Sequence, residues 1–435
     1  MKKILMMAAA VLLSLPFAQA QDTAKVRIKP YGFVRNYLNV DSRRMMTVCG
    51  GEYLMIPYDE DWNMTEAQAQ LYDAADERFD RNAVPEAHLL ALSTRFGLKL
   101  EGGNLCGFRL SGRVEGDFAG FGTSNTVLRL RLAYVTLDKD GHQLLVGQDW
   151  HPLSGCLMPE VLGMAAGAPF RPHSRTSQVR YTLNPDGLGL SAAALWQYQY
   201  TSPGPDGEST AYANRSLVPE LFFGLHYKGH DIYAQLGVDY TNMLVRQEIP
   251  VVDNMTGATL YNHLDVGRCH SFSPTLYFQY TPGLFSLKMR STLAQNLGHL
   301  NMLSGYAWAV DADGDMAYIP MQASVSYLDL AWGQRWRVNL MLGYQQNFGL
   351  ADKDYSIVGL NADYLYMKKG VKNIHNIFRC APSISYNTKA FNIGLEYEMT
   401  GITYGQVDPT DGTILPDNRR LVFGHRLCAL VKYNF

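Results

Sequence analysis

The chain lacks the long apolar runs that cross a membrane as helices. Its mean hydropathy is −0.14. Its one continuous apolar segment runs from Ile4 to Leu15. A spanning helix needs roughly 20 such residues, so this segment is too short. The sequence therefore argues against a helical membrane protein.

The first 20 residues have the pattern of an exported chain. Two lysines precede the apolar segment, a proline follows it, and Ala18 and Ala20 supply the small residues of a cleavage site. This pattern predicts a signal peptide over residues 1–20, cleaved before Gln21, and a mature domain over residues 21–435. An uncleaved anchor is the alternative, but the segment is short and no cysteine follows it to carry a lipid.

Strong charge bias and catalytic motifs are also absent. The net charge is −2 and no basic run occurs, so nucleic-acid binding has no electrostatic basis. The 11 histidines form no HExxH motif, and no P-loop, GxSxG or GxGxxG motif occurs. We therefore expect no enzyme activity, no cofactor and no metal site. A lipid or peptide hydrolase remains an alternative, because Ser and His on neighbouring strands leave little trace in a sequence.

Cysteine and aspartate patterns carry little chemistry. The six cysteines show no CxxC or zinc spacing, and we expect small, half-buried residues; they are Cys49, Cys106, Cys156, Cys269, Cys380 and Cys428. If any pair is bridged, Cys49 with Cys156 is the candidate, since both fall in expected loops. The run DADGD at 311–315 could hold calcium, but no Glu stands at the twelfth position, which favours a solvated loop.

What the chain does contain is a recurring period-two alternation of apolar and polar residues. In FNIGLEYEMTG, Phe391, Ile393 and Leu395 share one face, and Glu396 and Glu398 lie on the other. Because backbone amides in lipid must pair within the protein, a chain with such segments and no apolar helices can span only as a closed barrel. We expect an all-β transmembrane antiparallel barrel of about 16 strands, at residues 30–42, 87–101, 105–118, 125–138, 141–152, 174–183, 188–201, 217–228, 230–242, 266–281, 284–296, 321–332, 334–348, 373–388, 390–404 and 422–435.

The connections between these segments alternate in length. Tight turns such as DKDG, NPDG and TPGL alternate with long polar segments, and only the external connection 119–124 is short. Outer-membrane barrels have short periplasmic turns and long external loops, whereas a soluble sandwich has no reason to place its long loops at one end. The alternation therefore favours a barrel in the bacterial outer membrane.

Cations recur on the polar face of the expected strands. Arg109 with Arg113, Arg129 with Arg131, and Arg335 with Arg337 lie two residues apart, like rungs along a wall. Ladders of like charge select ions in channels, although the same arginines could simply pair with carboxylates and fill a polar interior. The expected channel-lining residues are Arg95, Lys99, Arg109, Arg113, Arg129, Arg131, Arg180, Lys288, Arg290, Arg335, Arg337 and Arg379.

The segment 153–173 differs from the other expected loops. It is rich in small and apolar residues, with Glu160 and Arg171 as its only permanent charges. An apolar loop at the external end gains free energy by burial, so we expect it to fold into the barrel as a constriction loop. Packing against another subunit is the alternative.

Three stretches of the chain resemble a known family. KPYGFVRNYLNVDSR, LRLRLAYVTLDKDGHQLLVGQDWHPL and FRCAPSISYNTKAFNIGLEYEMTGITYG are similar to porin-like outer-membrane proteins of Bacteroidetes, close to the trimeric DcaP family. The resemblance implies a homotrimeric channel with an inward-folded third loop and a preference for small anionic solutes. The chain departs from the family in one respect, since only about ten residues precede the first strand after the expected cleavage site, without heptads.

The resemblance also bears on partners. The ending LVKYNF, with Phe435 last, is similar to the signal that the barrel-assembly machinery recognises. We expect outer-membrane lipid and lipopolysaccharide around the barrel, small anionic solutes within it, and no nucleic acid. A non-conducting surface barrel or adhesin is a further alternative.

Overall fold

The computed structural model describes residues 26–120, 127–154, 158–246, 248–252, 259–263, 267–359 and 363–435. The expected signal peptide, residues 1–20, and Cys156, the candidate partner of Cys49, lie outside these ranges. Helices are short and lie in the connections: η1 (Cys49–Gly51), α2 (Glu66–Leu71), η2 (Ala75–Glu77), α3 (Ala211–Asn214), η3 (Gly298–Leu300) and η4 (Pro416–Asn418). Among the described residues, no helix is long and apolar enough to cross a bilayer.

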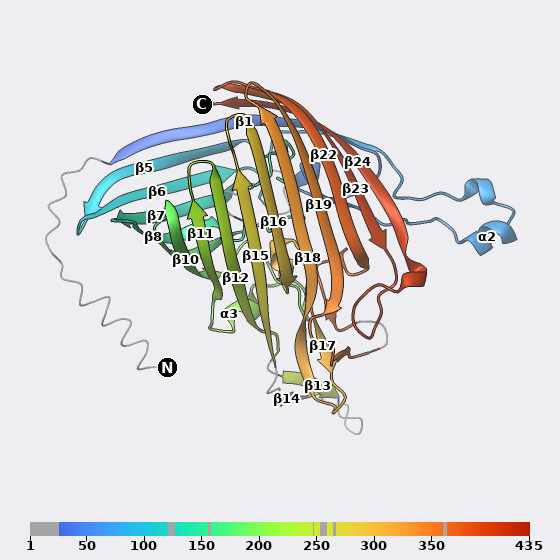
Figure 1. Ribbon diagram of the computed structural model, residues 1–435. Coiled ribbons are helices and arrows are strands. Elements are labelled where there is room, and N and C mark those ends of the chain that lie inside the picture. The colour runs from blue at the N-terminus through green and yellow to red at the C-terminus, as the bar shows by residue number, and fades with distance from the viewer. Residues whose placement is uncertain are drawn as a thin grey trace.

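The chain folds into a closed antiparallel barrel of 16 strands, as the alternation predicted (Figure 1). Each strand pairs with the next one along the chain, and β1 closes the ring by pairing with β24, with Phe33 opposite Asn434. The wall strands are β1 (Arg27–Asp41), β5 (Arg95–Leu105), β6 (Phe108–Asp117), β7 (Arg129–Lys139), β8 (His142–Trp150), β9 (Arg175–Leu183), β10 (Gly187–Trp196), β11 (Glu220–Lys228), β12 (Ile232–Leu244), β15 (Arg268–Tyr280), β16 (Phe285–Gln295), β18 (Met316–Gly333), β19 (Trp336–Leu350), β22 (Ile374–Asn387), β23 (Phe391–Tyr404) and β24 (Arg420–Asn434).

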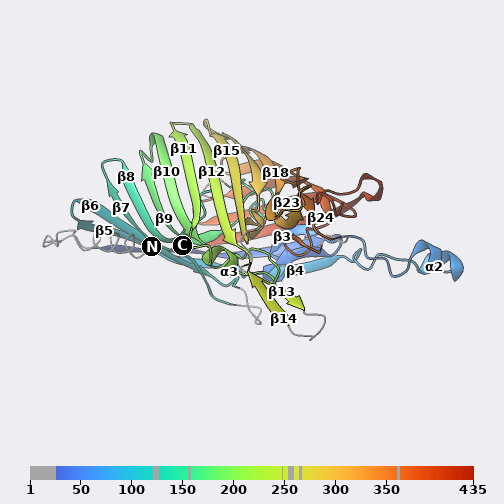
Figure 2. The same ribbon diagram turned by 90° about the horizontal axis from the view of Figure 1, so that it is seen from below.

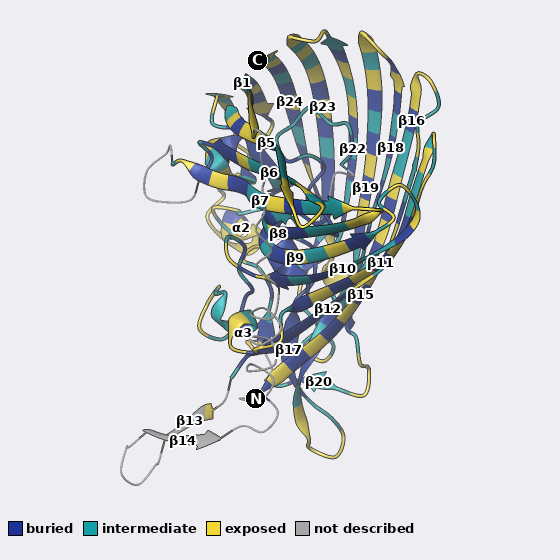
Figure 3. Ribbon diagram, turned by 90° about the vertical axis from the view of Figure 1, so that its left-hand side faces the viewer, coloured by how far each residue is buried: buried dark blue, intermediate teal, exposed yellow. Residues whose placement is uncertain are grey.

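The wall strands form because each alternates between a polar lumen and an apolar outer surface. On β24, Phe423 and Leu427 are exposed on the outside, whereas Arg426 and Cys428 are buried. The same alternation of exposed and buried residues runs along most wall strands (Figure 3). A wall whose outer face is apolar over most of its strands is a surface that faces lipid.

Aromatic side chains gather at the end of the barrel that carries the tight turns. Trp332 and Trp336 flank the turn between β18 and β19, and Tyr433 and Phe435 lie at the same end of the barrel, where β24 ends; all four are exposed. Aromatic rings at this level are typical of the interface between lipid and water. Because closed barrels of this kind are the architecture of the bacterial outer membrane, the protein is an outer-membrane barrel.

The structure adds detail that periodicity did not reveal. The predicted strand 87–101 is interrupted at residues 91–94, which separate β4 (Glu86–Leu90) from β5; both pieces pair with β1. The long connections contain further strands, because their backbone groups also need partners: β2 (Met45–Val48), β3 (Tyr53–Pro57), β13 (Glu248–Val252), β14 (Thr259–His263), β17 (Tyr306–Val310), β20 (Ser356–Ile357) and β21 (Leu365–Tyr366). The connection that carries α2 extends well away from the barrel (Figures 1 and 2).

Candidate functional site: the lumen and its inner loop

The segment between β8 and β9, described at residues 151–154 and 158–174, lies inside the barrel. Its described residues contact lumen-facing side chains of β16, β18, β19, β22, β23 and β1. In the ring order of strands, β19 and β22 lie opposite β8 and β9. The segment therefore crosses the lumen from one wall to the other, and we call it the inner loop.

Polar groups of the far wall hold the backbone of the inner loop. Glu396 on β23 accepts hydrogen bonds from the N–H groups of Leu162, at 2.6 Å, and Gly163, at 2.9 Å. Arg379 on β22 donates to the carbonyl oxygen of Ala168 at 2.9 Å. The backbone groups of an irregular segment need hydrogen-bond partners when they are buried, and charged side chains form strong hydrogen bonds with them.

Close packing fixes the apolar part of the inner loop. Phe170 is fully buried within the core cluster that also contains Met341. A Cβ added at Gly343 would lie 2.3 Å from the Phe170 ring, so this wall position accommodates the ring only as glycine. On the other side, Leu162 packs against Tyr37, whose hydroxyl donates to the Leu162 carbonyl oxygen at 3.0 Å.

The Glu160 carboxylate anchors the inner loop electrostatically. It pairs with Arg337 on β19, which donates through both Nε and Nη2, and with Lys288 on β16 at 3.2 Å. Burial alone would raise the pKa of Glu160, but the hydrogen bonds from Arg337 and the charge of Lys288 outweigh burial and hold it at about 2. The carboxylate is thus ionised at neutral pH.

We expect Glu160 to stay ionised between pH 8 and pH 4, so a change of pH within this range should not alter the conductance through this residue. A carboxyl with a lowered pKa stabilises the fold above its ordinary pKa of about 4.5, and this contribution is lost only as the pH falls toward 2.

Glu160→Gln should increase current fluctuations without releasing the loop, because hydrogen bonds to charged groups contribute roughly 1.5–3 kcal/mol each and several others remain. Single-channel recordings of this variant, beside Asp313→Asn on an exposed turn, test the assignment. Unchanged noise in Glu160→Gln would show that the pair does not restrain the loop.

Facing the inner loop, four arginines on β5, β6 and β7 share two carboxylates. Asp117 accepts two hydrogen bonds from Arg129, both at 2.9 Å, and one from Arg131 at 2.7 Å. Glu115 pairs with Arg131, Arg95 and Arg113, at 2.9, 3.4 and 3.0 Å. We call these six residues the arginine cluster. Its cations outnumber its carboxylates by two, so it has a net positive charge of two.

Two further arginines lie close to the cluster: Arg171, which was expected in the constriction loop, and Arg175, which the sequence pattern did not single out. The ring of Trp150, at the end of β8, lies within 6 Å of the guanidinium groups of Arg131, Arg171 and Arg175. Burial lowers the pKa of Arg171 to about 10, which leaves it charged at neutral pH. Burial and the neighbouring Arg171 hold the pKa of His173 well below its usual value, so His173 is neutral and accepts from Arg171 at 2.9 Å.

A cavity of about 740 Å³ lies between the arginine cluster and the inner loop. Basic side chains dominate the charges around it: Arg35, Arg95, Arg129, Arg131, Arg171, Lys368 and Lys369, with Glu208 as the acidic one among the described residues. Met, Trp and Tyr side chains complete the lining. The site therefore offers positive charge beside apolar surface.

The other predicted lining residues occupy varied places. Arg180 pairs with Asp149 at 2.7 Å, Lys99 lies over the Tyr31 ring, Arg290 is buried over the Tyr277 ring, and Arg109 is exposed near the tight-turn end of β6.

The prediction that Arg335 lies on a strand is wrong. It is exposed in the turn between β18 and β19 rather than on a strand, because β18 continues to Gly333 and β19 begins at Trp336. It therefore does not form a rung with Arg337.

Two weaker candidates from the sequence were a calcium site at residues 311–315 and a hydrolase site. The Asp311 carboxylate accepts hydrogen bonds from the N–H groups of Asp313 and Asp315, at 3.0 and 2.8 Å, as in an ordinary turn. Among the described residues, no histidine ring is hydrogen-bonded to the side chain of a Ser, Thr or Cys, the arrangement that an activated nucleophile needs. The described part of the chain thus shows no Ser–His pair of the kind on which the hydrolase alternative was based.

Known proteins resemble the chain in fold rather than in sequence. No protein-family model matches it, and no curated protein matches it significantly. The outer-membrane channel DcaP of Acinetobacter baumannii is similar in structure, with a TM-score of 0.61 and 16% identity over 94% of this chain and 97% of that one. OmpT of Vibrio cholerae, an outer-membrane protein, matches with a TM-score of 0.50 and 11% identity over 94% and 98% of the two chains. The chain thus has a porin-like outer-membrane channel fold.

Proposed function

We propose that this protein is a porin that lets small hydrophilic, preferentially anionic, solutes diffuse across the bacterial outer membrane. The observation that carries the proposal is the cavity between the arginine cluster and the inner loop, where most of the charged side chains are cationic. Sixteen strands make a barrel wide enough to hold water, and the inner loop narrows that space to a passage lined by the cluster. Arginine stays ionised at neutral pH, so an entering anion meets a permanent positive field.

Weak attraction of a solute by several charged groups in turn favours conduction more than tight binding at one site does. The cluster's carboxylates neutralise part of its charge, so each guanidinium offers a solute only partial attraction, and the solute can leave again. The reversal potential of the purified protein in a planar bilayer, under a salt gradient, tests the selectivity. Anion preference supports the proposal, and cation preference contradicts it.

We predict that the protein assembles as a homotrimer. This prediction rests on the family resemblance and on the need of a wide barrel for support along its flat outer walls. Seminative gels in mild detergent should show a heat-sensitive species of about three times the mass of the mature chain, which is smaller than the 48.7 kDa of the full sequence, and light scattering should agree. A monomer in several detergents would refute the trimer and leave the fold untouched.

The outer wall and the C-terminus suit the partners of such a barrel. The exposed apolar wall fits outer-membrane lipid and lipopolysaccharide. Phe435 exchanges two backbone hydrogen bonds with Gly32, both 3.1 Å, so the last residue closes the barrel seam. Its exposed ring also fits recognition by the barrel-assembly machinery.

A further inference from the structure

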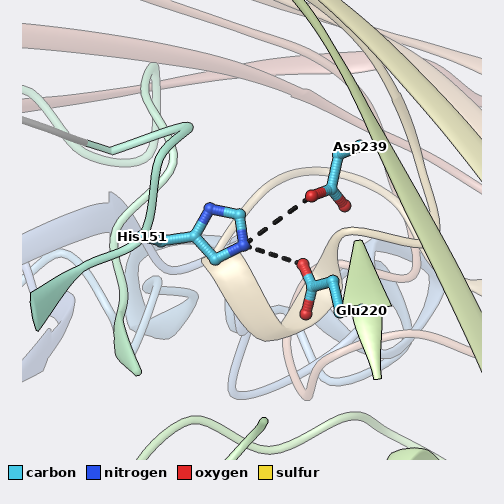
Figure 4. A group of neighbouring side chains, drawn as sticks. All are labelled: His151, Glu220 and Asp239. Atoms are coloured by element: carbon cyan, nitrogen blue, oxygen red, sulfur yellow. Dashed lines mark hydrogen bonds and ion pairs between the residues drawn. The ribbon is translucent and has the colours of Figure 1, made fainter. Parts of the chain in front are cut away.

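A buried group of ionisable side chains lies where the inner loop leaves the wall. His151 directly follows β8, and Glu220 and Asp239 project from the neighbouring strands β11 and β12 toward it (Figure 4). The His151 Nε2 atom lies 2.8 Å from the Glu220 Oε1 atom and 3.8 Å from the Asp239 Oδ1 atom. The three side chains are each at least nine-tenths buried.

A second histidine completes this group. The Nε2 atom of His299, on η3, lies 3.1 Å from both oxygens of Glu220, and this side chain is also buried. Two imidazoles and two carboxylates from four separate elements thus meet at Glu220. We call them the root cluster.

The two carboxylates of the root cluster carry more negative charge than nearby cations neutralise. Among the described residues, the two carboxylates form ion pairs only with the imidazoles, and no Lys or Arg approaches them. The Asp239 Oδ1 atom is buried and accepts no hydrogen bond. Leu153, Phe222 and Leu300 belong to the apolar cluster beside them. Two adjacent buried carboxylates in such a place need a shared proton or a cation between them.

We propose that His151, Glu220 and Asp239 of the root cluster bind one divalent first-row transition-metal ion, of which zinc is the best fit. Imidazole nitrogen and carboxylate oxygen are zinc donors, and ligand atoms at roughly 2.0–2.1 Å in a tetrahedron lie roughly 3.3 Å from one another. The His151 Nε2 atom lies 2.8 Å from Glu220 and 3.8 Å from Asp239, and these separations bracket that value. One ligand atom each from His151, Glu220 and Asp239 lies within 4.8 Å of the others.

Metal binding would rearrange protons at the site. The Nδ1 atom of His151 accepts from the N–H of Leu153 at 3.1 Å, so its proton is on Nε2, where it is donated to Glu220. With Nε2 bound to a metal, that proton moves to Nδ1 and the contact with Leu153 opens. The proton shared by the two carboxylates is released to solvent, so about one proton leaves for each ion bound.

The ion would stabilise the root of the inner loop. It would link His151, at the start of the loop, to two wall strands, and the contact of Glu220 with His299 connects these strands to η3. The other end of the loop already contacts η3, because the N–H of His173 donates to the Leu300 carbonyl oxygen at 2.9 Å. No sequence motif indicated this site, because its three ligands lie far apart in the chain.

Titration of the untagged, chelator-treated protein with Zn²⁺ tests the proposal. Calorimetry should show one saturable site per chain in the micromolar range or tighter, and Co²⁺ should give the visible absorption of a four-coordinate site. Asp239→Asn and His151→Gln, which nearly keep side-chain size, should weaken binding by at least roughly 100-fold. His270→Gln, on the outer wall, is the matched control and should bind as the native protein does.

Native mobility on gels before heating verifies that each variant is folded. His151→Gln decides the question if Asp239→Asn does not fold, because His151 follows the last residue of β8 rather than lying in a wall strand. Absence of saturable Zn²⁺ binding by the native protein would show that the root cluster is a proton-sharing network only. Equal binding by His151→Gln and the native protein would also overturn the assignment. Neither outcome depends on whether the barrel conducts.

Discussion

Replacing residues 158–170 with a short Gly/Ser linker should raise the single-channel conductance, roughly doubling it or more, since a 16-stranded barrel is otherwise wide enough for an aqueous channel. The removed residues include Glu160 and Phe170, which hold the loop against the far wall. The wall should survive the change, because its strands pair with one another and not with the loop. The side chains that lose partners, such as Glu396 and Arg379, would face water in the opened lumen.

A deletion outside the lumen provides the control for this experiment. Residues 66–77, which contain α2 and η2, lie far from the barrel, so their removal should leave conductance unchanged (Figure 1). Unchanged conductance after loss of 158–170, in a variant with native mobility on gels, would contradict the assignment of the inner loop as the constriction.

Neutralising the surplus charge of the arginine cluster should weaken the anion preference without abolishing it, because four other cations still line the cavity: Arg35, Arg171, Lys368 and Lys369. Arg95→Gln with Arg113→Gln removes the two surplus charges and leaves Arg129 and Arg131 bound to both carboxylates. Charge reversal at Arg129 and Arg131 would move the reversal potential further toward cations, but it would crowd four carboxylates together and is the riskier change for folding. The double glutamine variant therefore tests the field with less disturbance of the wall.

A substitution that makes the arginine cluster more positive, rather than less, makes this test sharper. Glu115→Gln leaves three positive charges in excess within the cluster and should strengthen anion preference, while Arg335→Gln, on the exposed turn, should change little. Because lumen charges are screened less than surface charges, the differences should persist at moderate salt. If the glutamine variants at 95 and 113 leave the reversal potential where it was, the arginines only fill a polar interior.

The strands could be predicted from sequence because a membrane barrel has one solvent on each side of its wall. That difference imposes strict alternation, as on β23, where Leu395 and Tyr397 face out and Glu396 and Glu398 face in. The strand boundaries agree with the structure to within a few residues in most cases. The break between β4 and β5 was missed because residues 91–94 contain no glycine or proline to mark a turn, although their backbone leaves the ladder.

Contacts between distant elements were beyond the reach of the sequence. Alternation placed Arg129 and Arg131 on the lumen side, but only strand register shows that Asp117 accepts from both. The composition of the segment 153–173 suggested burial, whereas its anchoring by Glu396 and Arg379 depends on strands more than 200 residues away in the chain. Arg335 was misplaced because a turn of two residues keeps the polar pattern of its strands.

The most direct test of the account is a single-channel recording of the purified native protein in a planar bilayer. The account predicts stable, stepwise increases of conductance as barrels insert, with anion preference in a salt gradient. A properly folded barrel that inserts and stays electrically silent would contradict the account and would favour a surface barrel with another role.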